Sequence, residues 1–356
     1  MEDMLKKATR SLKSPRNIMS VLTVVVLVLI IYLTRDELVH AWGLLGQANL
    51  WLLALLIPLQ IFVYFAGGEM IFSYLRRKKI IGHISRFEQT RIALELNLVN
   101  HVFPSGGVSG ISYATWRLHK LGVNTAKSTF AQLIRYVSAF VSLMALIIIA
   151  VLALALDGSV NRYIVVSSFA LVLVVVGLVM LLFYMFSSEK RMNTMAHRIA
   201  RIINRVVILA TLGKVRGYMS QDRVVGFFAE MHRDFGELID DKKLLIRPLL
   251  WGAFYAIVDV LMFMVVFWSL GQSVNPAVLL VGYGVAGLAS IVAFTPGGAG
   301  VYEVIMIYFL SVAGVASPVA IAGIVLTRVI LLAGTIIFGY IFYQHALWKY
   351  GKRVDA

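Results

Sequence analysis

The chain has 356 residues, of which 60% are hydrophobic and only 14% are charged, and its mean hydropathy is +0.85. This composition excludes an ordinary soluble domain and indicates a membrane protein with several spans. The absence of cysteine excludes disulfides, thiol catalysis and cysteine-ligated zinc. The net charge of +15 does not indicate nucleic-acid binding, because the basic residues lie between apolar segments, as in cytoplasmic loops.

The apolar segments predict one transmembrane domain over residues 18–345, between a basic N-terminal segment at 1–17 and a short tail at 346–356. A polar loop with Arg35 and Asp36 is expected after the first span. The stretches long enough to cross a bilayer are 18–34, 50–75, 128–156, 163–186, 248–270 and 317–343.

The only long polar region is 188–247, and it predicts helices rather than a separate domain. Met192, Met195 and Ile199 recur at helical spacing, while Arg198 and Arg201 lie on another face. A second apolar stripe follows within the same region. We therefore expect amphipathic elbow helices on the cytoplasmic surface, against an anionic leaflet.

A glycine hairpin occurs twice, once at 103–110 and once at 294–301. Each copy lies between apolar segments too short to cross a bilayer alone, which predicts re-entrant hairpins at about 87–117 and 276–313. An arginine follows each hairpin proline, 31 residues later in the first copy and 32 in the second. This shared spacing favours an internal duplication over two unrelated loops, and such interruptions mark transporter binding sites.

The basic residues predict the topology. Of the 33 lysines and arginines, 29 lie in segments that this topology places in the cytoplasm. Both termini are therefore expected in the cytoplasm. Three full spans separate the hairpins, so the hairpins enter from opposite faces. The predicted fold is an all-α polytopic membrane protein, an inverted repeat with two re-entrant helical hairpins.

The hairpins and their arginines predict a site for an anion at the membrane midplane. Helix N-termini offer unpaired N–H groups and a partial positive charge, and arginine suits bidentate phosphate binding. The alternative is that both arginines only pair with acids of the protein. The candidate binding residues are Arg135, Arg328, Glu303, Ser105, Gly106, Gly107, Pro296, Gly297, Gly298 and Asp259.

The acidic candidates each have a structural and a functional interpretation. Glu303 lies early in a helix, where a carboxylate complements the dipole, but it is also placed to contact a headgroup, carry a proton or gate Arg328. Asp259 lies in mid-span, where an acid costs about 2.5–3.5 kcal/mol on insertion scales. A salt bridge to an arginine would explain Asp259 equally well. Glu95 and Arg91 are four residues apart and suit a simple pair.

The segments Pro104-Ser105-Gly106-Gly107 and Pro296-Gly297-Gly298-Ala299-Gly300-Val301-Tyr302-Glu303, with Arg328 beyond, carry a resemblance. Over roughly residues 18–345 the chain resembles the transmembrane, flippase-like domain of bacterial lysylphosphatidylglycerol synthases and its stand-alone relatives. The resemblance implies lipid movement between leaflets of the cytoplasmic membrane. It implies that the second motif and Arg328 are functional residues, and it implies this less specifically for Arg135. The sequence lacks the aminoacyl-transferase domain of the synthases, so making lysyl-lipid is not expected of this chain alone.

The predicted function is that of a flippase for a phospholipid or a lipid-linked phosphate, without enzymatic activity, cofactor or metal. Three alternatives stay open: a membrane glycosyltransferase or accessory enzyme acting on polyprenyl-phosphate sugars, a secondary transporter of a soluble anion, and a scaffold. The sequence has no DxD motif and no Walker-type motif. The expected partners are membrane lipids, with a homo-oligomer left open and no nucleic acid.

Overall fold

The computed structural model describes residues 25, 28, 32, 35–46, 48–103, 107–156, 162–210, 219–292, 295 and 298–351. Helices make up nearly all of these residues, and no strand occurs among them. The predicted first span, 18–34, and the predicted loop residues Ser105, Gly106, Pro296 and Gly297 lie outside the described residues, apart from three scattered positions of the span.

Five helical stretches within the described ranges are long and apolar enough to cross a membrane, and they match the other five predicted spans. They are Leu50–Arg77, Thr125–Ala153, Arg162–Phe186, Lys242–Ser269 and Ser317–Tyr350. The helices that contain them are α4 (Leu50–Ala54), α5 (Leu56–Arg77), α8 (Thr125–Leu156), α9 (Arg162–Phe186), α12 (Ile246–Ser269) and α15 (Ser317–Tyr350).

Two pairs of shorter helices occupy the positions predicted for the hairpins. The first pair is α6 (Arg86–Val102) and α7 (Val108–His119), and the second is α13 (Pro276–Val292) and α14 (Val301–Val312). The helices of each pair pack against each other. The prediction of an all-α membrane protein is confirmed, whereas re-entry from opposite faces stays a prediction.

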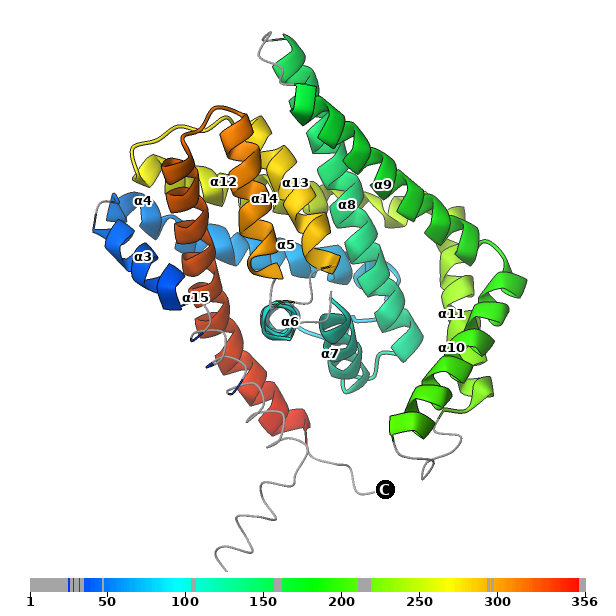
Figure 1. Cartoon of the computed structure of the whole chain (residues 1–356). Coiled ribbons are helices and arrows are strands. Elements are labelled where there is room, and N and C mark those ends of the chain that lie inside the picture. The colour runs from blue at the N-terminus through cyan, green and yellow to red at the C-terminus, as the bar shows by residue number, and fades with distance from the viewer. Residues whose placement is uncertain are drawn as a thin grey trace, which may run out of the picture.

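The packing of the two halves is reciprocal. Helices α5 and α12 pack along each other at the centre (Figure 1). Helix α6 of the first pair packs on α15, and α13 of the second pair packs on α8. Each pair thus leans on the long helix that follows the other pair. This arrangement is expected if the chain is an internal duplication in which each half packs against the other.

The segment expected as a polar loop after the first span is a helix, α3 (Arg35–Leu45), so that expectation was wrong. Leu44 and Leu45 are partly buried against the apolar cluster that contains Leu53 and Leu56, and α3 contacts α15. Burial of these leucines supports the helix despite the charged residues in its first turn.

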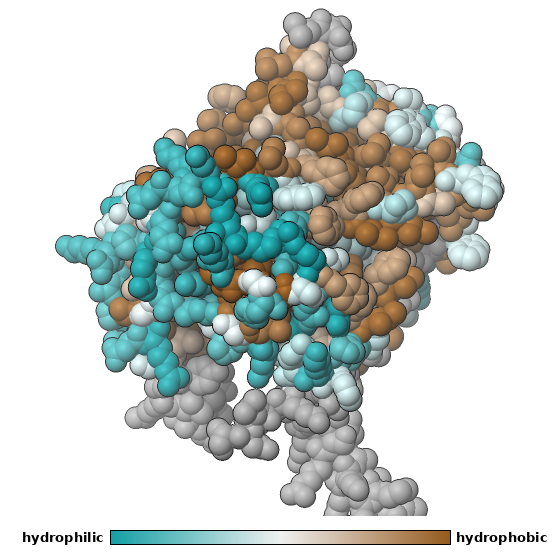
Figure 2. Space-filling model, turned by 180° about the vertical axis from the view of Figure 1, so that it is seen from behind, coloured by the Kyte–Doolittle hydropathy of each residue, from teal (hydrophilic) through white to brown (hydrophobic). Residues whose placement is uncertain are grey.

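The polar region contains α10 (Glu189–Ala210), α11 (Gln221–Asp240) and a 3₁₀ turn, η1 (Lys242–Leu244). Hydrophilic side chains gather over this end of the molecule, and apolar side chains cover much of the rest of the same face (Figure 2). Lys78, just beyond α5, joins this region through ion pairs to Asp234 and to Glu237, the latter at 2.7 Å. Burial opposes the charged form of Lys78, but the hydrogen bonds to both acids outweigh it and raise its pKa. The ammonium therefore stays charged and holds α11 to α5.

A charge cluster of four residues binds the first hairpin together. Arg117 of α7 and Glu95 of α6 are both fully buried, and Arg117 Nε donates to Glu95 Oε2 at 3.2 Å. Arg117 also pairs with Glu88. Arg91 completes the cluster, 3.3 Å from Glu88 and 3.9 Å from Glu95, so the predicted pairing of Arg91 with Glu95 is confirmed.

The same cluster binds this hairpin to the C-terminal helix. Arg91 Nη2 lies 2.8 Å from His345 Nδ1, and the Arg117 guanidinium lies 4.0 Å from the centre of the Tyr350 ring. Both contacts reach α15, which also packs along α6. The attraction between opposite charges in a protein interior offsets the free-energy cost of their desolvation only when each charge has several partners, as here.

Removing Arg117 should destabilise the protein far more than removing Arg86. We expect Arg117→Met to cost about 3–5 kcal/mol, because the fully buried Glu95 and the partly buried Glu88 keep only Arg91 as an ion-pair partner. The matched change Arg86→Met should cost about 0–1 kcal/mol, because the Arg86 side chain is 63% exposed. Thermal unfolding in detergent measures both. Equal melting temperatures for the two variants would contradict a stabilising cluster.

The predicted topology is open to single-cysteine labelling, because the chain has no cysteine of its own. Ser273, in the exposed connection between α12 and α13, is expected outside the cell, and Lys120, after α7, inside. In intact cells an impermeant maleimide should label Ser273→Cys and should label Lys120→Cys only after lysis. Labelling of both in intact cells would contradict hairpins that open to opposite faces.

Candidate functional site

The second hairpin ends in a glycine turn that starts α14. Gly298 and Gly300 have φ of 73° and 86°, in the left-handed region that glycine adopts at little cost. The backbone N–H of Gly300 donates to Glu303 Oε2 at 2.6 Å. Glu303 therefore caps the helix that it belongs to, which is the structural interpretation of this residue.

The other oxygen of Glu303 binds the intramembrane arginine of α15. Arg328 Nε donates to Glu303 Oε1 at 2.7 Å, and both side chains are largely buried, with 24% and 20% of their surface exposed. The Arg328 guanidinium also lies 4.5 Å from the centre of the Tyr302 ring. The alternative that an intramembrane arginine pairs with an acid of the protein is therefore correct for Arg328.

The first hairpin has the corresponding turn. Gly107 has φ of 91° and is the N-cap of α7. An added Cβ there would lie 2.6 Å from the hydroxyl of Tyr136, so only glycine fits. Tyr136 follows Arg135 on α8, so the turn lies directly over the segment of α8 that carries this arginine.

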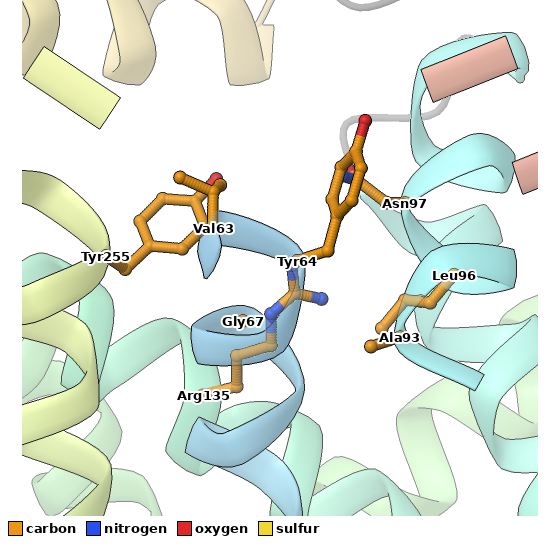
Figure 3. Close-up of a pocket in the computed structure, with 8 residues that line it drawn as sticks. All are labelled: Val63, Tyr64, Gly67, Ala93, Leu96, Asn97, Arg135 and Tyr255. Atoms are coloured by element: carbon orange, nitrogen blue, oxygen red, sulfur yellow. The ribbon is translucent and has the colours of Figure 1, made fainter. Parts of the chain in front are cut away.

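Arg135 has surroundings unlike those of Arg328. Its side chain reaches into a cavity of about 10 Å³, room for about one water molecule, between α5, α6, α8 and α12 (Figure 3). Tyr64 and Tyr255 flank it, and it approaches the backbone of α5 at Gly67. Its Nη1 is buried and has no hydrogen-bond partner among the described residues. Arg135 also forms no ion pair with any of them.

Two neighbours of Arg135 on α8 share this lack of partners. Gln132 is 1% exposed, and neither its amide nitrogen nor its oxygen is hydrogen-bonded within the described part of the chain. The Ser138 hydroxyl, fully buried one turn beyond, is also without a partner there. Buried polar atoms normally have partners, so these mark a place for water or a ligand.

Sequence reasoning missed Gln132 and Ser138. The available signal was their spacing, because the polar residues of α8 fall three or four apart and so share one helix face. This α8 polar stripe consists of Ser128, Gln132, Arg135, Ser138 and Ser142. A polar stripe on a long apolar helix is typical of a wall that faces other protein or water rather than lipid.

Asp259 of α12 has no ion-pair partner among the residues that the structure describes, so its predicted alternative, a salt bridge to an arginine, is not found there. It lies deep in the bundle and keeps part of its surface accessible. Its hydrogen-bond partner is the hydroxyl of Tyr283 on α13. Tyr283 in turn is hydrogen-bonded to Tyr255, which is one of the residues that line the Arg135 cavity.

The candidates share one region of the bundle. Arg328 acts electrostatically on Asp259, and both Arg328 and Arg135 act on His101 of α6. His101 Nδ1 lies 2.9 Å from the backbone carbonyl of Asn97. The structure thus brings Arg135, Arg328, Glu303 and Asp259 around one centre, next to the turns of both hairpins. Glu69 lies apart and pairs with Arg76 and Arg86.

Within the described residues, no group of three or more side chains is placed to hold a metal ion. What the centre offers is hydrogen-bond donors and charge. Two guanidinium groups, several tyrosine hydroxyls and the first turns of α7 and α14 can bind an anion, and no step of bond making is needed to explain them.

The comparisons with known proteins fit this description. No curated protein and no solved structure matches the chain significantly. The family described as the lysylphosphatidylglycerol synthase TM region matches residues 17–339, which include five of the predicted spans, most of the sixth and both hairpins. The chain therefore belongs to the family of the lysylphosphatidylglycerol synthase TM region.

Proposed function

We propose that this protein moves a lipid with an anionic headgroup from one leaflet of the cytoplasmic membrane to the other. The observation that carries the proposal is that Arg135 has a buried Nη1 without a partner and, unlike Arg117, no paired acid among the described residues. A guanidinium N–H buried without a partner is costly, and a phosphate or similar oxyanion would satisfy it. The unpaired amide of Gln132 and hydroxyl of Ser138 extend the same polar face.

A lipid suits this site better than a soluble solute. The membership of the chain in a lipid synthase family supports a lipid-related role in the membrane. The polar headgroup would enter the bundle and contact the α8 polar stripe, while its acyl chains stay in the bilayer. Fixed polar partners offset part of the cost of taking a charged headgroup out of water.

The two arginines have different roles in this proposal. Arg328 is largely neutralised by Glu303, which also caps α14, so this pair holds the second hairpin against α15. Arg135 has no acid of its own among the described residues and is the main anchor for the headgroup. Gly107, the N-cap of α7, contacts Tyr136 next to Arg135, so the N-terminus of α7 can add backbone donors.

A soluble anion could use the same donors, and this is the second candidate function. The small cavity at Arg135, about 10 Å³, admits no free organic anion as it stands. A lipid can insert only its headgroup between the helices while its acyl chains stay in the bilayer, so a lateral opening the size of the headgroup is enough. We therefore rank lipid movement first and assign the chain no enzymatic activity.

Reconstitution in proteoliposomes tests the proposal. Purified protein should speed the exchange of fluorescent phosphatidylglycerol between leaflets, measured by chemical quenching of the outer leaflet. Arg135→Met should slow the exchange about ten- to hundred-fold, because charge-assisted hydrogen bonds contribute about 1.5–3 kcal/mol and each 1.4 kcal/mol is about ten-fold.

The matched control is Arg162→Met, at the exposed start of α9, which should leave the rate unchanged. Protein that is folded by size-exclusion chromatography and moves no lipid would contradict the proposal. Uptake of free phosphate into the same vesicles, without lipid exchange, would favour the soluble-anion transporter instead.

The pair of Arg328 and Glu303 should behave as one unit in stability measurements. We expect Arg328→Met or Glu303→Gln alone to cost about 1.5–3 kcal/mol, because each leaves a largely buried charge or N–H group without its partner. The double variant should cost less than the sum of the two. Thermal unfolding of the four proteins in one detergent measures this coupling. Strict additivity would mean that the contact contributes nothing to stability.

A further inference from the structure

Asp259 poses the question of what a carboxyl group does at the centre of an apolar bundle. It lies near the middle of α12 and forms no ion pair with any described residue. A permanently ionised carboxylate in this position is costly. A carboxyl group that can take up a proton avoids that cost whenever it is neutral.

We propose that Asp259 takes up and releases a proton in each cycle, so that the protein moves one proton together with each anionic headgroup. This inference rests on the proposed function and supplies its energy source. It assigns to Asp259 a part in coupling and none in headgroup binding.

The charges around Asp259 explain why a proton and an anion would bind together. The central charged residues are Arg135, Arg328, Glu303 and Asp259. With both acids ionised, the two positive and two negative charges cancel. With Asp259 neutral, one positive charge is left over, in the region where the headgroup phosphate binds. Protonation therefore favours anion binding, and loss of the proton favours release.

The surroundings of Asp259 favour a proton over a metal cation. Sodium sites in transporters use carbonyl groups of unwound helices, but α12 is continuous from Ile246 to Ser269, so its carbonyls are engaged in the helix. Among the described residues, the side-chain oxygens that interact with Asp259 include the hydroxyls of Tyr283 and Tyr255. One carboxylate and two phenols provide too few ligands for a sodium ion.

Two groups of hydroxyls lie near Asp259. Tyr283 is the partner of Asp259 and of Tyr255, and Tyr64 lies within electrostatic reach of Asp259. The Tyr64 hydroxyl lies 2.7 Å from Thr335 Oγ1 and accepts from Gln60 Nε2 at 2.6 Å. Hydroxyl groups both donate and accept, so Tyr283 and Tyr255 can pass a proton to or from Asp259, with water at its accessible side.

The proposal concerns Asp259 among several other groups. The titratable or charged residues that interact with Asp259 are Tyr255 on its own helix and Tyr64, Tyr283, Tyr302 and Arg328 on neighbouring elements. Arg135, Glu303 and His101 lie next to these residues. Of these, Glu303 is engaged twice, by Arg328 and by the Gly300 N–H, and His101 is the one histidine, so it is the other group that the variants must test.

The test uses the same proteoliposomes with a pH gradient and with the membrane potential held at zero by valinomycin and equal potassium. Fluorescent phosphatidylglycerol should accumulate in the leaflet that faces the alkaline side, because the proton carries the anion with it. This direction is independent of how the protein is oriented. One proton per lipid allows up to about ten-fold asymmetry for each pH unit. A proton ionophore should abolish the asymmetry.

The variants identify the responsible group. Asp259→Asn should still equilibrate lipid without a gradient, which shows that it is folded, but should no longer accumulate lipid. Asp259→Glu should recover accumulation, and His101→Gln should keep it. Accumulation that persists in Asp259→Asn, or that is lost only in His101→Gln, would overturn the assignment. A sodium gradient that drives accumulation at equal pH would overturn the choice of the proton.

The two proposals can fail separately. Wild-type protein that equilibrates the leaflets but never accumulates lipid would refute the coupling and leave lipid movement standing. Wild-type protein that moves no lipid, with or without a gradient, would refute both.

Discussion

The cost of burying charge inside an apolar helical bundle is the constraint on which the rest of this structure depends. Where a buried charge stabilises the fold, oppositely charged or aromatic side chains surround it. Arg117, fully buried, is held by Glu95 and Glu88 and lies against Tyr350. Arg328 is held by Glu303. Arg135 differs from both, because it has a buried N–H group without a described partner and, unlike them, forms no ion pair with any described acid. The same physical rule explains the paired arginines as structure and is the reason for proposing the unpaired one as a binding residue.

The two halves of the bundle use charge in different places, although their helices pack reciprocally. The first hairpin is fastened to α15 far from its turn, where Arg91 and Arg117 meet His345 and Tyr350. The second hairpin is fastened to α15 close to its turn, where Glu303 meets Arg328. Helix α15 therefore contacts both hairpins through charged groups, at points separated along its length. A rigid movement of α15 would act on both hairpins at once, which is what a protein needs if it is to open first one side of a central site and then the other.

Sequence reasoning went further with the fold than with the site, and the reason is physical. Five spans, the hairpin positions and the two intramembrane arginines follow from local properties: apolar length, glycine turns and isolated charge. The helix at Arg35–Leu45 was missed because its support comes from distant contacts of Leu44 and Leu45. The sequence also could not predict that Arg328 pairs with an acid and Arg135 does not, because this depends on which side chains of other helices lie nearby. Gln132 and Ser138 were visible only as spacing, since burial without a partner is a property of the packed bundle.

The separation of Asp259 from Arg135 is the last consequence of the same constraint. Direct contact between them would form a stable ion pair and leave neither group free for a proton or a phosphate. Tyr255 interacts with both groups: it lines the cavity of Arg135, lies within electrostatic reach of Asp259 and shares the hydroxyl of Tyr283 with it. An acid and a base that are near each other but not paired form an arrangement that folding stability alone does not favour, and it is the arrangement that coupled binding of a proton and an anion requires.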